Sequence, residues 1–427
     1  MEVIVIGAGI GGLTLALALE ARGIACRVYE SAPAVTPIGV GINILPHATR
    51  ELTALGLEEA LTTVGIATAE SCFYNRFGQF IHREPLGRHA GYDWPQVSIH
   101  RGDLQALLYR AFIARAGADR VVTGWRCIRI EQDAEGVTAY FTGADGRALP
   151  PQRGAVAIGC DGIHSTIRKQ LHPAGGDPIY SGVNMWRGVT RAKPFLSGAS
   201  YVRAGWLTHG KLVIYPIRNN IDAAGRQLIN WVVEIETPKF KQRDWNRPGR
   251  LEDFIGAFES WRFDWLDVPA LLRASEMVLE FPMVDQDPLE RWSFERMTLL
   301  GDAAHPMYPR GSNGAGQAIL DARALANSLV EHADDPAAAL RAYENRRLPA
   351  TAKIVLMNRS SPPDVVIREV YLRTGDKPFR SIDEVISKDE ILTLTDNYKR
   401  IAGYDRAALG RRAGPAGGRA SGSPESV

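Results

Sequence analysis

The first twelve residues hold the glycine pattern G-x-G-x-x-G at Gly7, Gly9 and Gly12, with Gly11 as a further glycine in the stretch GAGIGG. The apolar run EVIVI precedes the pattern and LTLALALEA follows it, which predicts a strand, a tight turn and a helix. In such a unit the first glycine permits the turn, the second lets backbone approach a pyrophosphate, and the third lets helix and strand close up. The helix N-terminus then offers unpaired N–H groups and its positive dipole end to the phosphates. This pattern predicts a dinucleotide site.

Glu30 ends the second predicted strand, Cys26–Tyr29. A carboxylate at that place accepts a hydrogen bond from the adenosine ribose and repels a 2′-phosphate, which favours FAD or NAD over NADP. The competing interpretation is a glycine-rich turn that binds something else, and the strand, the helix and Glu30 together weigh against it. The fingerprint alone does not distinguish FAD from NAD.

Two further motifs place an aspartate directly after a predicted strand. Gly301-Asp302 follows the strand MTLL, and Asp161-Gly162 follows a strand at 155–158. Because ligands of doubly wound sheets bind at the carboxyl ends of the strands, both aspartates are candidates for one crevice. Either string alone could equally be a turn with an Asx cap.

The order of these elements predicts an α/β fold in several parts. A Rossmann-type dinucleotide-binding domain is expected at residues 1–176 and 281–335. The runs YVRAG, KLVIYPI, QLINWVVEIE and MVLEFPMV predict an inserted antiparallel-sheet substrate domain at 177–280. A helical C-terminal region is expected at 336–409. The glycine- and proline-rich segment 410–427 is expected to be a disordered tail.

Composition excludes several classes of function. The chain has 427 residues, of which 45% are hydrophobic and 23% charged, as in ordinary globular proteins. Its 50 basic and 48 acidic residues give a net charge of +2, which provides no electrostatic basis for binding nucleic acid or a membrane surface. The four cysteines stand far apart and the nine histidines are scattered, so no metal site is expected and a reducing cytoplasmic setting fits.

Taken together, GAGIGG, CDGIHSTIR and LLGDAAHPMYPRGSNGAGQAILDA resemble the single-component, FAD-dependent aromatic hydroxylases, the group of para-hydroxybenzoate and salicylate hydroxylases. The resemblance covers the chain from residue 1 to about residue 355. Within the group, segments such as GVGINILPHA, SIHRGDLQALL and MWRGVT are similar to the flavin monooxygenases of phenazine biosynthesis. The resemblance therefore implies non-covalent FAD as the cofactor and reduced nicotinamide, NADH or NADPH, as a transient co-substrate.

The resemblance also implies roles for individual residues of the cofactor site. Asp302 matches the family's aspartate at the ribityl chain and pyrophosphate, and Asp161 and Gly162 match a motif tied to FAD and nicotinamide. Arg101, with Gln105 one helical turn on, matches the arginine that reaches the phosphates or the ribityl chain. The residues that match the loops around the flavin ring are Gly41, Pro309, Gly314 and Ala315.

The substrate pocket is expected between the inserted sheet and the flavin. Tyr215 matches a tyrosine that often faces substrate in the family and could hold a phenolate by a hydrogen bond, or be an ordinary sheet tyrosine. Arg187 could anchor a substrate carboxylate or pair within the core. His209, in a turn-like segment, and Tyr308, beside the flavin loop, are further catalytic candidates.

The expected activity is hydroxylation of an aromatic or heteroaromatic acid or phenol, with or without decarboxylation, by NAD(P)H and O₂ through a flavin C4a-hydroperoxide. Alternatives are a flavin-dependent reductase or oxidase without oxygen insertion, or a non-catalytic flavoprotein acting through partners, because fold alone does not determine reaction. Both a monomer and a homodimer are compatible with the sequence.

Overall fold

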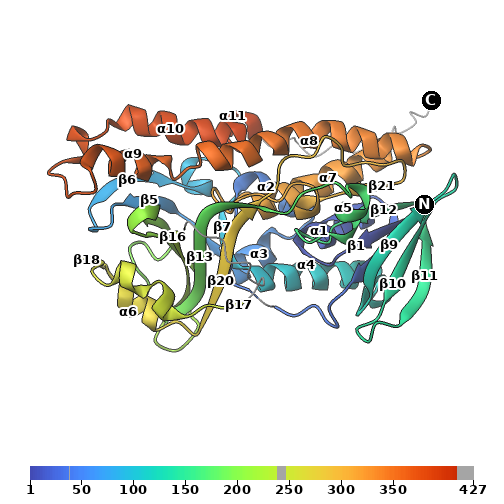
Figure 1. Cartoon of the computed structure of the whole chain (residues 1–427), viewed down its shortest axis with the longest axis horizontal. Helices are drawn as coiled ribbons and strands as arrows, with labels where there is room; N and C mark the ends of the chain where they lie inside the picture. Colours follow the sequence, from blue (N-terminus) through green and yellow to red (C-terminus); the bar gives the residue numbers. More distant parts are fainter. Residues whose placement is uncertain (38, 238–246, 411–427) are drawn as a thin grey trace, which may run out of the picture.

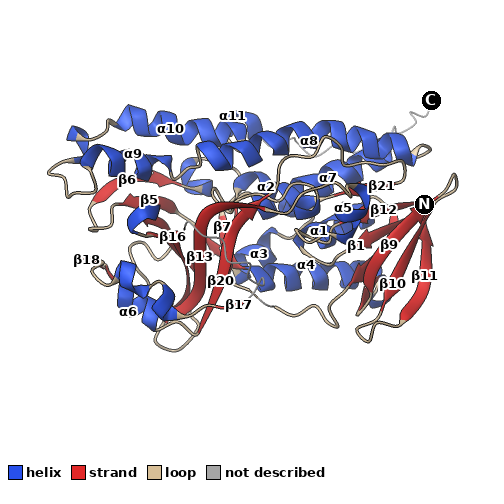
Figure 2. Ribbon diagram, viewed as in Figure 1, coloured by secondary structure: helices blue, strands red, loops and turns tan. Residues whose placement is uncertain are grey.

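The computed structural model describes residues 1–37, 39–237 and 247–410. Figure 1 shows a part built on the N-terminal strands, a second part built on long curved strands, and C-terminal helices that run along both. Figure 2 colours the helices and strands differently and shows that the C-terminal layer is helical, whereas both other parts contain strands. The two parts meet where the candidate site lies.

A five-stranded parallel sheet forms the first part, in the order β21-β12-β1-β2-β8. Its strands are β1 (Glu2–Ile6), β2 (Ala25–Glu30), β8 (Val121–Thr123), β12 (Val156–Gly159) and β21 (Met297–Leu299). Val3, Ile4 and Val5 of β1 are all buried, as a central parallel strand covered on both faces requires. The strands predicted from the apolar runs are confirmed.

Helices α1 (Ile10–Glu20), α4 (Arg101–Ala116) and α7 (Gly314–Glu331) pack together against this sheet. Tyr29 of β2 contacts Phe141 of a three-stranded antiparallel sheet, with ring centroids 4.6 Å apart. That small sheet was not expected from the sequence; it consists of β9 (Arg126–Gln132), β10 (Val137–Thr142) and β11 (Ala148–Gly154). The smaller elements nearby are α2 (Pro46–Ala54), α3 (Glu58–Val64), α5 (Thr166–Leu171), β3 (Gly41–Ile44), β4 (Ile66–Ala67) and β7 (Val97–His100).

An eight-stranded sheet forms the second part, in the order β17-β20-β13-β16-β15-β14-β5-β6. The strands are β5 (Glu70–Tyr74), β6 (Phe80–Pro85), β13 (Ile179–Ala192), β14 (Ser200–Gly205), β15 (Lys211–Arg218), β16 (Gln227–Glu236), β17 (Arg247–Pro248) and β20 (Met277–Asp285). All neighbours are antiparallel except β14 and β5.

The predicted range 177–280 for the second domain therefore differs from the observed sheet. Strands β5 and β6 come from residues 70–85, and β20 extends past residue 280. The sequence could not show this, because strand pairing between distant segments depends on packing and not on local pattern. Helix α6 (Val268–Arg273) and the short strands β18 (Arg262–Phe263) and β19 (Leu266–Asp267) cover one face of this sheet.

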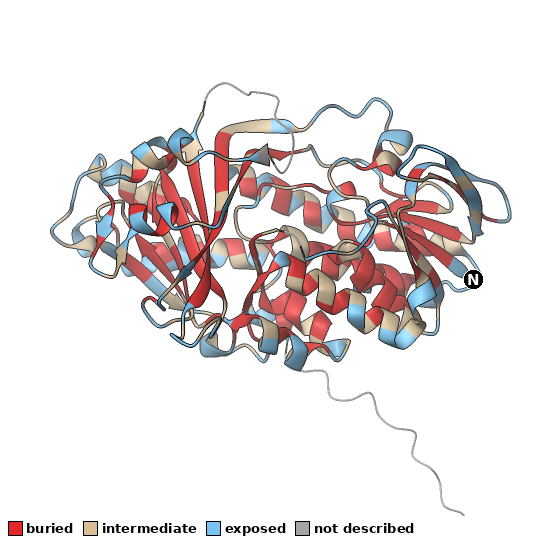
Figure 3. Ribbon diagram, turned by 90° about the horizontal axis from the view of Figure 1, so that it is seen from below, coloured by how far each residue is buried: buried red, intermediate tan, exposed pale blue. Residues whose placement is uncertain are grey.

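Four helices follow α7: α8 (Pro336–Ser360), α9 (Val365–Thr374), α10 (Lys388–Ile401) and α11 (Arg406–Leu409). They confirm the predicted helical region, and the break at residues 361–364 contains Pro362 and Pro363. The predicted tail lies outside the described residues except for Gly410. Figure 3 shows buried residues concentrated in the two sheets and the helices between them. None of the helices in the described ranges is long and apolar enough to cross a membrane.

Helix α1 approaches β1 so closely that Gly12 has no room for a side chain. A Cβ at Gly12 would lie 2.0 Å from the carbonyl oxygen of Gly7, whereas a Cβ at Gly9 would meet nothing within 4 Å. We therefore expect Gly12→Val to lower the free energy of unfolding by more than about 3 kcal/mol, because overpacking forces helix and strand apart. Gly9→Ala is the matched control and should unfold at the parent temperature. Equal melting temperatures for Gly12→Val and the parent would contradict this account of the loop.

Candidate active site

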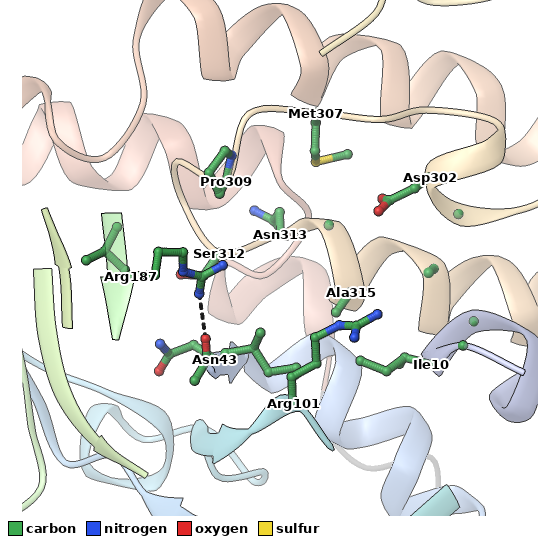
Figure 4. Close-up of a pocket in the computed structure, with 18 of the residues that line it drawn as sticks. Ile10, Asn43, Arg101, Arg187, Asp302, Met307, Pro309, Ser312, Asn313 and Ala315 are labelled. Carbon is green, nitrogen blue, oxygen red and sulfur yellow. Dashed lines mark hydrogen bonds between the residues drawn. The ribbon is translucent and has the colours of Figure 1, made fainter. Parts of the chain in front are cut away.

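One cavity runs from the glycine-rich loop to the eight-stranded sheet (Figure 4). Gly9 and Gly11 line it at the loop, where α1 begins at Ile10 without a side-chain cap or an acidic residue in its first turn. Gly7 has φ +105°, which only glycine adopts without strain, and its N–H donates to the Tyr29 carbonyl. The free N–H groups of the first turn therefore face a cavity and not a capping side chain.

Glu30 and Gln105 support this loop from behind. The Glu30 carboxylate accepts hydrogen bonds from the backbone N–H groups of Ala8 and Ala32, each at 2.8 Å. Gln105 donates from Nε2 to the Ala8 carbonyl, also at 2.8 Å. Neither side chain lines the cavity itself.

Asp302 lies on the cavity wall in the turn that follows β21, with its side chain exposed to the cavity. Desolvation by the protein around it raises the pKa of its carboxyl group. Arg101, the first residue of α4, lines the same cavity from another side (Figure 4). The loop end of the cavity therefore carries one cation and one anion.

A buried network that the sequence analysis missed holds the Asp302 turn in place. The carboxylate of Asp321 accepts from the Gly301 N–H at 3.2 Å, contacts His305 Nε2 at 2.6 Å, and accepts from Arg347 Nε at 2.7 Å. The charges of His305 and Arg347 lower the pKa of Asp321 against its burial. The sequence shows Asp321, which lies on α7, only as the aspartate of the ILDA string, because its partners belong to other elements, the Asp302 turn and α8.

Asp161 is placed differently from its prediction. Its carboxylate caps α5, accepting from Ser165 Oγ at 2.5 Å and from the Thr166 N–H at 2.7 Å, and it does not line the cavity. Its neighbours Cys160 and Gly162 do line it. Arg168 donates to the carbonyls of Ala303 and Ala304, at 3.1 and 3.0 Å. Through Arg168 the motif therefore supports the Asp302 turn, and the Asp161 carboxylate is engaged at the start of α5.

The loop before α7 forms another wall of the cavity. Pro309, Gly314 and Ala315 line it, and α7 begins at Gly314 without a side-chain cap from Asn313. The buried Asn313 side chain instead donates to the Tyr398 hydroxyl of α10 at 3.0 Å. A second uncapped helix N-terminus therefore opens into the same cavity as α1.

Arg187 and Tyr215 lie at the sheet end, as predicted for residues that face substrate. Arg187 donates from Nη2 to the carbonyl of Gly41 at 2.7 Å, the bond drawn in Figure 4. Gly41 also lines the cavity, and its N–H donates to Asn230 Oδ1 at 2.7 Å. Tyr215 stacks on Tyr201 with centroids 5.0 Å apart, and burial raises the pKa of Tyr215 so that its hydroxyl stays protonated.

His209 and Tyr308 do not line the cavity, so their predicted contact with substrate does not agree with their positions. His209 lies in the turn before β15, about half exposed, with Nδ1 3.1 Å from Asp376. Tyr308 is buried, with its hydroxyl beside Asp285, while Met307 and Pro309 on either side reach the cavity. Adjacent residues of an extended loop point in different directions, which motif matching did not resolve.

Several wall residues were not identified from the sequence. They include Asn43, Tyr201, Val213, Val232, Glu234, Ser312 and Asn313. The two on β16, Val232 and Glu234, alternate along QLINWVVEIE, so the period of a strand would have found them once one face of the sheet was known.

Comparison with known proteins agrees with this geometry. A family model described as FAD binding domain matches residues 1–358. The phenazine 1,6-dicarboxylic acid hydroxylase PhzS of Lysobacter antibioticus is 44% identical over 363 residues, 84% of this chain and 89% of that protein. The 3-amino-4-hydroxybenzoate 2-monooxygenase PtnB3 of Streptomyces platensis is 34% identical, covering 96% and 98%. The chain belongs to the family of FAD-dependent aromatic monooxygenases.

A solved structure has the same fold over most of the chain. HpxO of Klebsiella pneumoniae, complexed with FAD and uric acid, has a TM-score of 0.70 and 26% identity, covering 94% of this chain and 92% of that one. FAD is the cofactor of the family, and the cavity described above fits it. The open space at Gly9 and the two uncapped helix N-termini offer N–H groups to anionic and polar parts of a dinucleotide.

Replacing Asp302 by alanine should weaken FAD binding. A carboxylate on the wall is a charge-assisted acceptor for ribityl hydroxyls, worth roughly 1.5–3 kcal/mol, or about 10- to 100-fold in affinity. Fluorescence titration of the apoprotein with FAD measures this. We expect a smaller loss for Glu30→Ala, because Glu30 does not line the cavity. A larger loss for Glu30→Ala than for Asp302→Ala would contradict the placement of the cofactor crevice.

Proposed function

We propose that the protein uses NADH or NADPH and O₂ to hydroxylate an aromatic or heteroaromatic acid, with or without loss of its carboxylate. The observation that carries this proposal is the single cavity that joins the dinucleotide loop to the sheet face bearing Arg187 and Tyr215. The relatives named above act on phenazine 1,6-dicarboxylic acid and on 3-amino-4-hydroxybenzoate, which are aromatic acids. No second dinucleotide fingerprint occurs in the sequence, so the nicotinamide is proposed to bind transiently.

The loop end of the cavity is proposed to hold FAD. The N–H groups at Gly9 and Gly11 would bind the pyrophosphate, Glu30 the adenosine ribose, and Arg101 and Asp302 the phosphates and the ribityl chain. When bound, FAD supplies the exchange of electrons with nicotinamide and the reaction with O₂.

The loop at Pro309, Gly314 and Ala315 is proposed to face the flavin ring. The α7 N-terminus has no side-chain cap there, so its dipole and N–H groups would stabilise negative charge on the ring. This stabilisation would be preorganised, because the buried Asn313–Tyr398 hydrogen bond fixes the start of the helix.

The sheet end is proposed to orient the substrate. Arg187 donates from Nη2 to the Gly41 carbonyl while its Nε has no hydrogen-bond partner, so the guanidinium is available to a substrate carboxylate. The protonated Tyr215 hydroxyl would donate to a phenolate oxygen and so hold an electron-rich ring in place. Met185, Val213 and Val232 make the wall between them apolar, which excludes water from the reacting atoms.

The test is a turnover assay on the purified, FAD-loaded protein. Aromatic acids that differ in ring type are screened for stimulated oxidation of NADH and of NADPH, and products are identified by mass spectrometry. We expect at least one acid to stimulate oxidation and to gain one oxygen atom. Consumption of nicotinamide without an oxygenated product for every acid tested would contradict the proposal.

Tyr215→Phe should uncouple the reaction while FAD binding and the fold persist. Only the hydroxyl is removed, so packing against Tyr201 changes little, but misplacement of the substrate by about 1 Å can cost on the order of 100-fold in rate. NADH consumption should continue with more H₂O₂ and less product per NADH. Equal product per NADH in variant and parent would show that Tyr215 has only a structural role in the sheet.

Arg187→Met should raise the KM for an aromatic acid about 10- to 100-fold, because a charge-assisted hydrogen bond to a carboxylate is worth roughly 1.5–3 kcal/mol. Arg191→Met is the matched control on the same strand. Arg191 is exposed, pairs with Glu276 and does not line the cavity. Similar KM values for the two variants would remove Arg187 from the substrate site.

A further inference from the structure

The cavity face of the eight-stranded sheet carries a second charged residue at the substrate end, Glu234. Strand register places Glu234 of β16 between Met185 of β13 and Lys211 of β15. The next row on the same face contains Arg187, Val232 and Val213, since side chains alternate along each strand. Glu234 is therefore a diagonal neighbour of Arg187, and both line the cavity.

Glu234 belongs to a buried cluster of four charged side chains. Lys211 Nζ lies 3.2 and 3.1 Å from the two oxygens of Glu234 and also contacts Asp364. Asp364, at the start of α9, pairs with Arg203 Nε at 3.0 Å. Two cations and two anions balance, which compensates the cost of burying them. The position of Glu234 is thus set by three side chains behind it.

Of these four side chains only Glu234 reaches the cavity wall. Lys211 supplies one hydrogen bond to each of its oxygens, and each carboxylate oxygen can accept more than one. Acceptor capacity therefore remains on the cavity side. Nearby, Arg187 has a buried Nε that donates to no protein group. The substrate end therefore offers a free donor with positive charge and a free acceptor with negative charge.

We propose that Glu234 is a specificity-determining residue that accepts a hydrogen bond from an amino group or a ring N–H of the substrate, while Arg187 binds its carboxylate. This inference rests on the proposed function and names the substrate class within it: aromatic acids that also carry an N–H donor. Glu234 would repel a second carboxylate at this position, whereas an N–H group carries no negative charge and donates a hydrogen bond to Glu234.

The test measures dissociation constants by isothermal titration calorimetry on the FAD-loaded protein, without nicotinamide. The ligands are 3-amino-4-hydroxybenzoate and 6-hydroxynicotinate, each compared with 4-hydroxybenzoate. In both donor-bearing ligands the N–H group lies next to the ring carbon that carries the oxygen substituent. It is an amino group in the first ligand and a ring N–H in the second. We expect each to bind the parent about 10-fold more tightly than 4-hydroxybenzoate, as one hydrogen bond to a charged group allows.

Glu234→Gln should bring the three constants to within about 2-fold of one another and leave the affinity for 4-hydroxybenzoate nearly unchanged. Glu236→Gln is the matched control on the same strand; Glu236 is exposed, accepts from Thr208 and does not line the cavity, so the preference should persist. The comparison of ligands on the parent is decisive even if Glu234→Gln fails to fold.

This inference alone would be overturned by acids that bind the parent without preference for the N–H donors, or by a Glu234→Gln variant that keeps the preference. An equal loss of affinity for all three ligands would also overturn it, since that result means that Glu234 only supports the sheet. Binding of no acid at all would contradict the proposed function as well, which separates the two failures.

Discussion

The close approach of α1 to β1 is the constraint on which the cofactor end of the molecule depends. A Cβ at residue 12 would lie only 2.0 Å from the Gly7 carbonyl oxygen, so no side chain fits there. This closeness brings the first turn of α1 to the carboxyl end of the parallel sheet and leaves its N–H groups without a side-chain cap. Glu30 and Gln105 then hold the loop through Ala8 from both of its backbone groups. An uncapped helix end and a carboxylate on the adjacent strand are what a dinucleotide requires.

The other walls of the cavity are fixed by buried polar networks. Asp321 joins the Asp302 turn to α7 and α8, and Tyr398 of α10 joins the loop before α7 to the C-terminal helices through Asn313. Each of these hydrogen bonds favours the observed arrangement, because a buried polar group that loses its partner costs the desolvation of that group. The networks therefore hold the walls of the cavity in place.

The C-terminal helices also reach the substrate end. Asp364, at the start of α9, supplies the carboxylate that balances Lys211 and Arg203 beneath the sheet. Figure 1 shows these helices lying along both parts of the molecule. In this chain the region beyond α7 is therefore part of the site's support.

Local pattern determined the parallel strands, the glycine loop, the helices and the places of Gly9 and Asp302 at the carboxyl ends of strands, whereas Arg101 and Tyr215 were expected at the site from the resemblance to the family. The strands, the loop and the helices follow from the sequence because strand–turn–helix geometry and the carboxyl ends of parallel strands are set by residues close together in the chain. Tertiary structure alone decided that residues 70–85 join the second sheet, that Asp161 caps a helix, and that His209 and Tyr308 turn away from the cavity. It also decided that Glu234 faces the cavity beside Arg187. Strand pairing, the direction of loop side chains and buried ion pairs depend on partners far away in the chain, and no local pattern encodes those partners.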